Sequence, residues 1–144
     1  SFWRKFEELN TRARSMDLEL EKAEKLISNL WKAVHSSDVN PETLEEIHEL
    51  KVEFDALDNK WEGYSTKNEI GEKNLPTVTS RLFSLQIGIS NSTYGPTNTH
   101  KDLSSWIEDD LNKLKTSLDK LKAGLQTIGR KIENNGGPQI EGID

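Results

Sequence analysis

The sequence contains no cysteine, four prolines, one methionine and no long run of apolar residues. Without cysteine the chain forms no disulfide and supports no thiolate chemistry, an absence compatible with any cellular compartment. A membrane-spanning helix needs about 18 consecutive apolar residues, so we expect no membrane span. Basic residues are too few for a nucleic-acid surface, because 19 Lys and Arg against 25 Asp and Glu leave a net charge of −6.

Length and composition indicate one elongated helical domain. The chain has 144 residues, enough for a single core, of which 33% are hydrophobic and 31% charged. This balance is typical of long helices that bury one stripe and expose the rest. We predict a single domain over residues 1–135, followed by a flexible tail over 136–144. Because the chain begins with Ser1 and a helical pattern starts at Phe2, we expect it to be a piece of a longer protein.

Apolar residues recur at alternating spacings of three and four, the pattern of amphipathic helices, in four segments. The first seam is the longest and extends over more than four heptads. It consists of Phe2, Phe6, Leu9, Ala13, Met16, Leu20, Ala23, Ile27, Leu30 and Val34. The predicted helices span residues 2–35, 41–63, 77–90 and 99–133.

Sequence signals also mark the helix ends. Pro41 occupies the first turn of the second helix, where a proline is well tolerated. Thr99 and Asp102 resemble a capping box for the last helix, and the Gly136-Gly137-Pro138 segment ends it.

Helix lengths constrain the assembly. At about 1.5 Å per residue, the second and third helices together match the length of the first or the fourth. We predict an all-α, antiparallel up-down bundle of three long rods, with the middle rod split into a longer and a shorter helix. The alternative is a four-helix bundle in which the short third helix turns back.

The residues that catalysis needs are scattered along the chain. The three histidines, His35, His48 and His100, lie far apart in the sequence. Glu45 and His48 form the Glu-x-x-His step of di-iron bundles, but a second copy of this step is lacking. We therefore predict no catalytic residue, no metal site and no cofactor. The tryptophans are assigned to the core or the edge of a seam: Trp3, Trp31, Trp61 and Trp106.

One segment departs from the charged composition. From Asn74 through His100, 27 residues carry a single charge, Arg81, where the average composition predicts about eight. Such a stretch indicates a covered junction before the last helix, in which Tyr94 packs its ring and Trp106 lies beneath. We interpret this corner as a helix junction or an interface. Its predicted members are Arg81, Ser92, Thr93, Tyr94, Gly95, Pro96, Thr97, Thr99, His100 and Trp106.

The strings PTVTSRL at 76–82 and STYGPTNTHK at 92–101 resemble the C-terminal helical region of large BNR-repeat, sortilin-like proteins. These proteins are often labelled glycosyl hydrolases and are common in Bacteroidetes. The likeness covers about residues 71–106. In that family any hydrolytic or ligand site would belong to a β-propeller marked by Asp-box strings, and this sequence contains no Asp-box. The resemblance implies an appended domain of an exported, extracytoplasmic protein whose partner is the propeller of the same chain.

Three functions follow as hypotheses. The first is a non-catalytic C-terminal domain that acts in interdomain packing or protein interaction. The second is an accessory part of a glycan- or peptide-binding or hydrolase site that the propeller completes. The third is a homo-oligomerising coiled coil built on the long seams.

Overall fold

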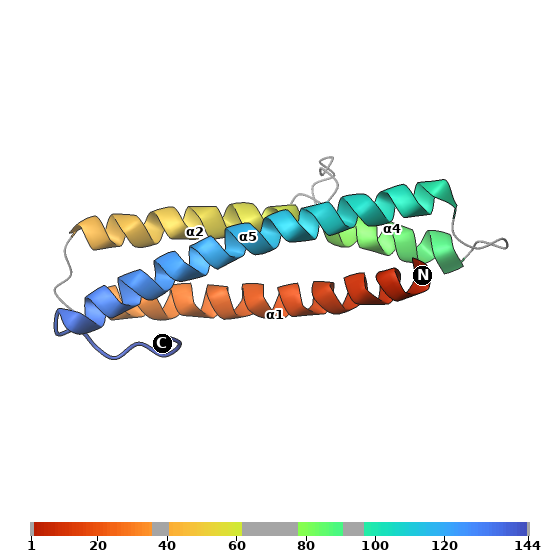
Figure 1. The fold of residues 1–144 in the computed structure, drawn as a ribbon. Coiled ribbons are helices and arrows are strands. Elements are labelled where there is room, and N and C mark those ends of the chain that lie inside the picture. Colours follow the sequence, from red (N-terminus) through yellow and green to blue (C-terminus); the bar gives the residue numbers. More distant parts are fainter. Residues whose placement is uncertain (1, 36–40, 62–77, 91–96, 144) are drawn as a thin grey trace. The chain divides into compact units, whose positions relative to one another are not determined.

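The structure is a computed structural model that describes residues 2–35, 41–61, 78–90 and 97–143. All regular secondary structure in these ranges is α-helical (Figure 1). The predicted all-α helical bundle is therefore confirmed, and the observed helix ends lie within two residues of the predicted ones. The helices are α1 (Phe2–His35), α2 (Pro41–Trp61), α4 (Val78–Ser90) and α5 (Asn98–Asn134).

The predicted seams form the core. In α1 every seam residue from Leu9 to Val34 is buried, and in α5 the seam is buried from Ile107 to Ile132. Trp61, at the end of α2, is fully buried, and its indole Nε1 donates a hydrogen bond to Asp17 Oδ1 of α1 at 2.5 Å. Burial of one large apolar side chain stabilises a fold by about 1.5–3 kcal/mol. The period of the sequence thus selects the faces that pack.

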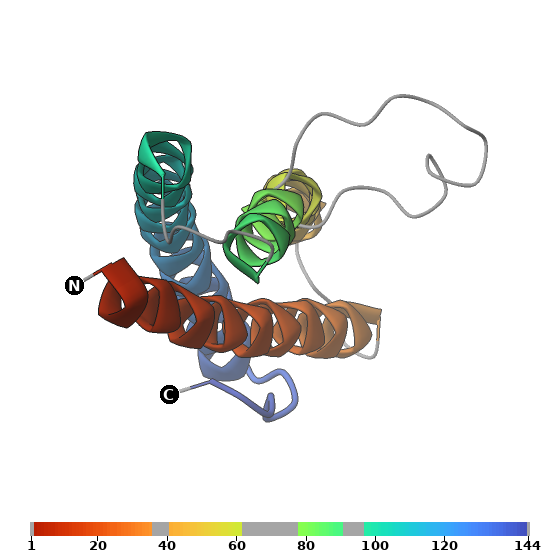
Figure 2. The same cartoon turned by 90° about the vertical axis from the view of Figure 1, so that its right-hand side faces the viewer.

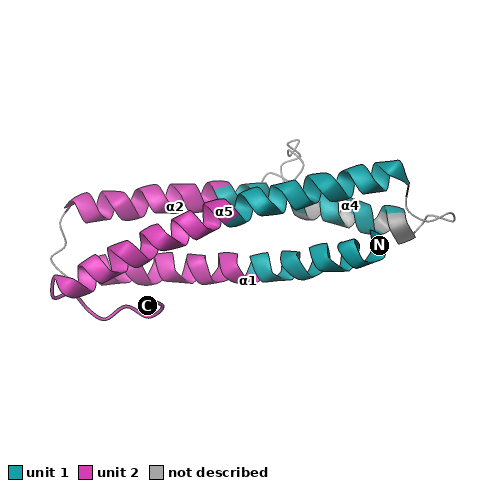
Figure 3. Cartoon of the chain, in the orientation of Figure 1, with its two compact units in different colours: residues 1–17, 57–115 teal, residues 18–56, 116–144 magenta. Residues whose placement is uncertain are grey.

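Contacts within the chain gather into two compact units (Figure 3), where sequence analysis expects one domain over 1–135. Unit 1 comprises residues 1–17 and 57–115, and unit 2 comprises residues 18–56 and 116–144. Both α1 and α5 supply helical segments to each unit. Unit 1 also contains α4 and residues 57–61 of α2, and unit 2 contains the rest of α2.

In unit 1, α4 runs in the direction opposite to α1 and α5 (Figure 1). Figure 2 shows these three helices packed around one another, not laid in a single layer. Polar pairs flank the seam between α1 and α5. Lys5 Nζ lies 2.8 Å from Glu108 Oε2, and Arg12 Nη2 donates to Asn112 Oδ1 at 2.6 Å.

In unit 2, α2 runs opposite to α1 and α5 (Figure 1). Gly124 of α5 lies directly against Leu50 of α2, because a Cβ placed there would be 3.2 Å from Leu50 Cδ2. Glu19 of α1 pairs with Lys122 of α5. The glycine thus allows α5 and α2 to approach closely, and the charge pair connects α5 to α1.

The end of α5 reverses the chain. Gly136 N donates to Glu133 O at 3.2 Å and Gly137 N donates to Ile132 O at 2.9 Å, the two bonds of a Schellman motif. Gly136 has a φ of 83°, which a residue with a side chain rarely adopts. A Cβ on Gly137 would lie 2.8 Å from Ile132 O. The two glycines therefore turn residues 138–143 back along unit 2.

The segment after this turn differs from the flexible tail that the sequence suggests. Ile140 is 4% exposed, and its backbone N–H donates to Glu133 Oε1 at 2.9 Å. Asn29 and Gln126 donate side-chain hydrogen bonds to the segment as well. Polar composition and terminal position favoured a loose tail, whereas the Schellman turn directs two isoleucines onto the helices.

Two glutamates carry an electrostatic signature of the α1–α5 contact, one in each unit. The hydrogen bond from Lys122 holds the pKa of Glu19 below its usual value of 4.5, and the hydrogen bond from Lys5 lowers the pKa of Glu108. Because the folded-state pKa is depressed, each glutamate adds stability above about pH 4.5, and this stability is lost as the pH falls through the lowered value.

We predict that Glu19→Gln lowers the free energy of unfolding at neutral pH by about 0.5 kcal/mol, the size of a partly exposed ion pair. The variant should also lose less stability than the parent between about pH 5 and pH 3, so that the two converge in acid. Urea unfolding followed by circular dichroism at several pH values measures both effects. Glu21→Gln, at an exposed position of the same helix, is the control. Parallel pH profiles for parent and Glu19→Gln would contradict the prediction.

Candidate functional site

Half of the predicted corner lies outside the described residues. Ser92, Thr93, Tyr94, Gly95 and Pro96 belong to this part, so the expected packing of Tyr94 is not addressed by the structure. The structure describes the other five members, which are Arg81, Thr97, Thr99, His100 and Trp106.

Thr97 and His100 form the cap of α5. Thr97 N donates to His100 Nδ1 at 3.1 Å, and His100 N donates to Thr97 Oγ1 at 3.3 Å. This reciprocal pair is a capping box in which an imidazole nitrogen replaces the usual carboxylate or amide oxygen. The predicted box at Thr99 and Asp102 is wrong, because the helix begins at Asn98 and Thr99 is already its second residue.

The His100 ring also contacts α4. A Cβ on Gly88 would lie 2.8 Å from His100 Nε2 and 3.3 Å from Cδ2. The absence of a side chain at Gly88 therefore leaves the space that the capping histidine occupies. In unit 1 this contact fixes the end of α4 against the first turn of α5.

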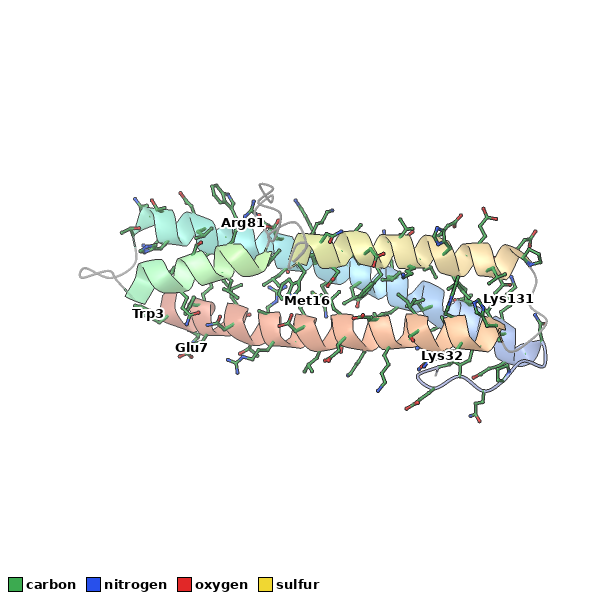
Figure 4. All side chains as sticks on the ribbon, turned by 180° about the vertical axis from the view of Figure 1, so that it is seen from behind. Trp3, Glu7, Met16, Lys32, Arg81 and Lys131 are labelled. Carbon is green, nitrogen blue, oxygen red and sulfur yellow. The ribbon has the colours of Figure 1, made fainter. Side chains whose placement is uncertain are left out.

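Arg81 bridges the same two helices farther along. Its Nη1 donates to Asp110 Oδ2 of α5 at 2.5 Å, and both side chains are about one-third exposed. Figure 4 labels Arg81 among the side chains of the molecule. A charge-assisted bond of this kind positions α4 on α5. Arg81 is thus engaged within unit 1, which gives it a structural role.

Three of the four tryptophans are exposed. Trp61 is buried as expected, but Trp3, Trp31 and Trp106 are 49%, 41% and 59% exposed. The predicted packing of Trp106 beneath the corner is not observed, because its position on α5 lies between the buried Ser104 and Ile107 and faces outward. Although Trp106 is next to the seam residue Ile107 in the sequence, its indole is exposed to solvent.

A groove between α1 and α2 in unit 2 contains one of these exposed indoles. It encloses about 550 Å³, and its buried floor includes Ile27 and Phe54. Trp31 and Val52, which is 55% exposed, stand at its rim. The Trp31 ring also lies 4.9 Å from the His35 ring. The groove therefore combines a buried apolar floor with partly exposed apolar side chains at its rim.

The groove is polar at both ends. Because α1 and α2 run in opposite directions, Glu24 and Asp55 lie toward one end, and Trp31 and His48 lie toward the other. Ser28 and Lys51 line the middle. The groove therefore offers an acidic end, a middle where Ser28 and Lys51 stand beside the buried apolar floor, and an aromatic end with an imidazole.

A smaller hollow in unit 1 has mixed charge. It encloses about 360 Å³ beside the Lys5–Glu108 pair. Three basic and two acidic side chains line it, so charges of both signs lie close together. The lining residues are Arg4, Lys5, Glu8, Leu9, Arg12 and Glu108.

The Glu45–His48 step does not gather further ligands in the described part of the chain. Among those residues, no group of three His, Asp or Glu side chains is placed to hold a metal ion. His48 instead lines the α1–α2 groove.

No helix in the described ranges is long and apolar enough to cross a membrane. No protein-family model, curated protein or solved structure matches the chain.

The sequence analysis did not predict the groove, although two apolar residues outside the helical seams could have indicated it. Trp31 follows the seam residue Leu30, and Val52 lies between the stripe positions Leu50 and Phe54. Both are apolar residues on the face that a simple amphipathic pattern assigns to solvent. Such off-seam residues mark a second apolar face.

We predict that Gly88→Ala destabilises the chain by about 0.5–1 kcal/mol, although alanine normally gains about 1 kcal/mol over glycine inside a helix. The new methyl group displaces His100 and breaks its bond to Thr97, which costs about as much as a lost cap. In a His100→Ala background the same change should be stabilising. A double-mutant cycle by urea unfolding measures this coupling. If Gly88→Ala changed the free energy of unfolding equally in both backgrounds, the predicted coupling between Gly88 and His100 would be wrong.

Proposed function

We propose that this chain is a non-catalytic helical domain that binds another protein surface through the α1–α2 groove of unit 2. The observation that carries the proposal is the exposed pair Trp31 and Val52 above a buried apolar floor. Following the resemblance, the partner is the β-propeller of the same exported BNR-repeat protein, and the location is extracytoplasmic.

Exposed apolar groups at a groove favour a protein partner. A tryptophan at the rim of a groove is a typical anchor for an interface, because covering its ring removes a large apolar area from water. Glu24 and Asp55 at one end would select a partner with a basic group there. Anchor and charges together give the groove a preferred direction of binding.

The roles of the shifted titratable groups support a non-catalytic domain. The lowered pKa values of Glu19 and Glu108 arise from their lysine partners on a neighbouring helix. These are ion pairs between packed helices, and their structural role accounts for the shifts. Arg81 of α4 is likewise paired with a residue of a neighbouring helix, Asp110 of α5.

A glycan or peptide accessory site is a second candidate. The exposure of Trp31 favours it, because an accessible indole stacks on the apolar face of a sugar while nearby carboxylates accept its hydroxyl groups. The coiled-coil hypothesis has less support. The α1 and α5 seams that would drive self-association are buried within the chain itself.

We predict that Trp31→Ala weakens binding to the separately expressed neighbouring domain of the parent protein at least about tenfold, the loss typical of a central aromatic anchor. Because Trp31 is 41% exposed, its truncation should cost less stability than the loss of a fully buried aromatic side chain, which typically costs about 3–5 kcal/mol. Titration calorimetry and thermal melts measure the two quantities. Trp106→Ala, an exposed tryptophan of unit 1, is the matched control.

Two outcomes would decide against this proposal. Unchanged affinity in Trp31→Ala would exclude the groove as the interface. Binding to a glycan array that disappears in Trp31→Ala, without binding to the neighbouring domain, would favour the accessory glycan site.

A further inference from the structure

The segment after α5 lies on unit 2 as a peptide lies in a binding site. Ile140 is buried, and Ile143 covers Gly129 so closely that a Cβ there would overlap its side chain. Gly142 lies over Leu26, which a Cβ would approach to 3.4 Å. Gly129 of α5 and Leu26 of α1 therefore provide the apolar contacts that receive the segment.

Side chains of α1 and α5 bind the backbone of this segment. Asn29 Nδ2 donates to the carbonyl oxygen of Glu141 at 3.2 Å, and Gln126 Nε2 donates to that of Gly142 at 2.8 Å. Glu133 accepts from Ile140 N. Backbone groups are common to all peptides, so these bonds fix the path of a ligand without specifying most of its side chains.

The selective features lie at three positions of the bound segment. Ile140 and Ile143 fill apolar positions, and Gly142 adopts a φ of 95°, which favours glycine. Ile143 N also bonds to Ile140 O at 3.4 Å, which closes a turn. The ligand pattern is thus an apolar residue, any residue, glycine and an apolar residue.

We propose that the α1–α5 face of unit 2 is a peptide-binding site whose resident is the chain's own residues 140–143. Its competing ligand is a segment of another protein with the same apolar-x-Gly-apolar pattern. This site uses other residues than the α1–α2 groove and does not depend on the function proposed for that groove. Attachment to α5 gives the resident a high effective concentration, so a competitor binds when it is abundant or when the resident is released.

The test uses the full chain with its resident released by Ile140→Asp and Ile143→Asp. The probe is a fluorescein-labelled, N-acetylated peptide of residues 135–144, measured by fluorescence anisotropy. We expect saturable binding to the double variant that is at least about tenfold tighter than binding to the parent, whose site is occupied. A peptide carrying Ile143→Asp should not bind.

Further variants locate the site and guard against unfolding. Adding Asn29→Ala to the double variant should weaken peptide binding about 3- to 10-fold, whereas Thr127→Ala, a polar truncation on α5, should not. If the double variant loses its helical circular dichroism, Gly142→Val replaces it as the released variant. A valine at this positive φ strains the backbone and should release residues 140–143. A helical released variant that fails to bind the peptide, or that binds it no better than the parent does, would overturn the proposal.

Discussion

Burial of an apolar seam with alternating spacings of three and four is the interaction on which the rest of this molecule depends. The seam of α1 is buried from Leu9 to Val34, and that of α5 is buried from Ile107 to Ile132. Each buried leucine, isoleucine, valine or methionine of these seams adds about 1.5–3 kcal/mol of transfer free energy, more than a typical surface ion pair. The polar features of the molecule are therefore arranged around faces that hydrophobic burial has already chosen.

Burial alone does not fix the register of two helices, since a slip of seven residues would again bring apolar faces together. Within unit 1 the pair Lys5–Glu108 discriminates between registers. The residues one heptad before and after Glu108 are Lys101 and Lys115, so a slip in either direction would place Lys5 opposite a lysine. Like charges at such a position disfavour the wrong register. The weak ion pair thus contributes specificity more than stability.

The parts that follow from local periodicity were predictable from the sequence, and the parts that depend on individual neighbours were not. The helices of the described ranges and their buried faces follow from spacing, as Leu9 and Ile107 illustrate. The cap at Thr97 was missed because a histidine at the third helical position is not part of the usual pattern. The exposure of Trp106 was not predicted, because the side chain of a residue next to a seam can lie either against the core or in solvent.

The candidate sites arise from apolar residues that do not belong to the helical seams. Trp31 and Val52 stand on faces that periodicity assigns to solvent, and Ile140 and Ile143 lie beyond the last helix. In unit 2 the isoleucines are received because the glycines after α5 turn the chain back and Gly129 leaves room. Trp31 and Val52 remain accessible. One unit thus carries an apolar face occupied by its own chain and another that is open.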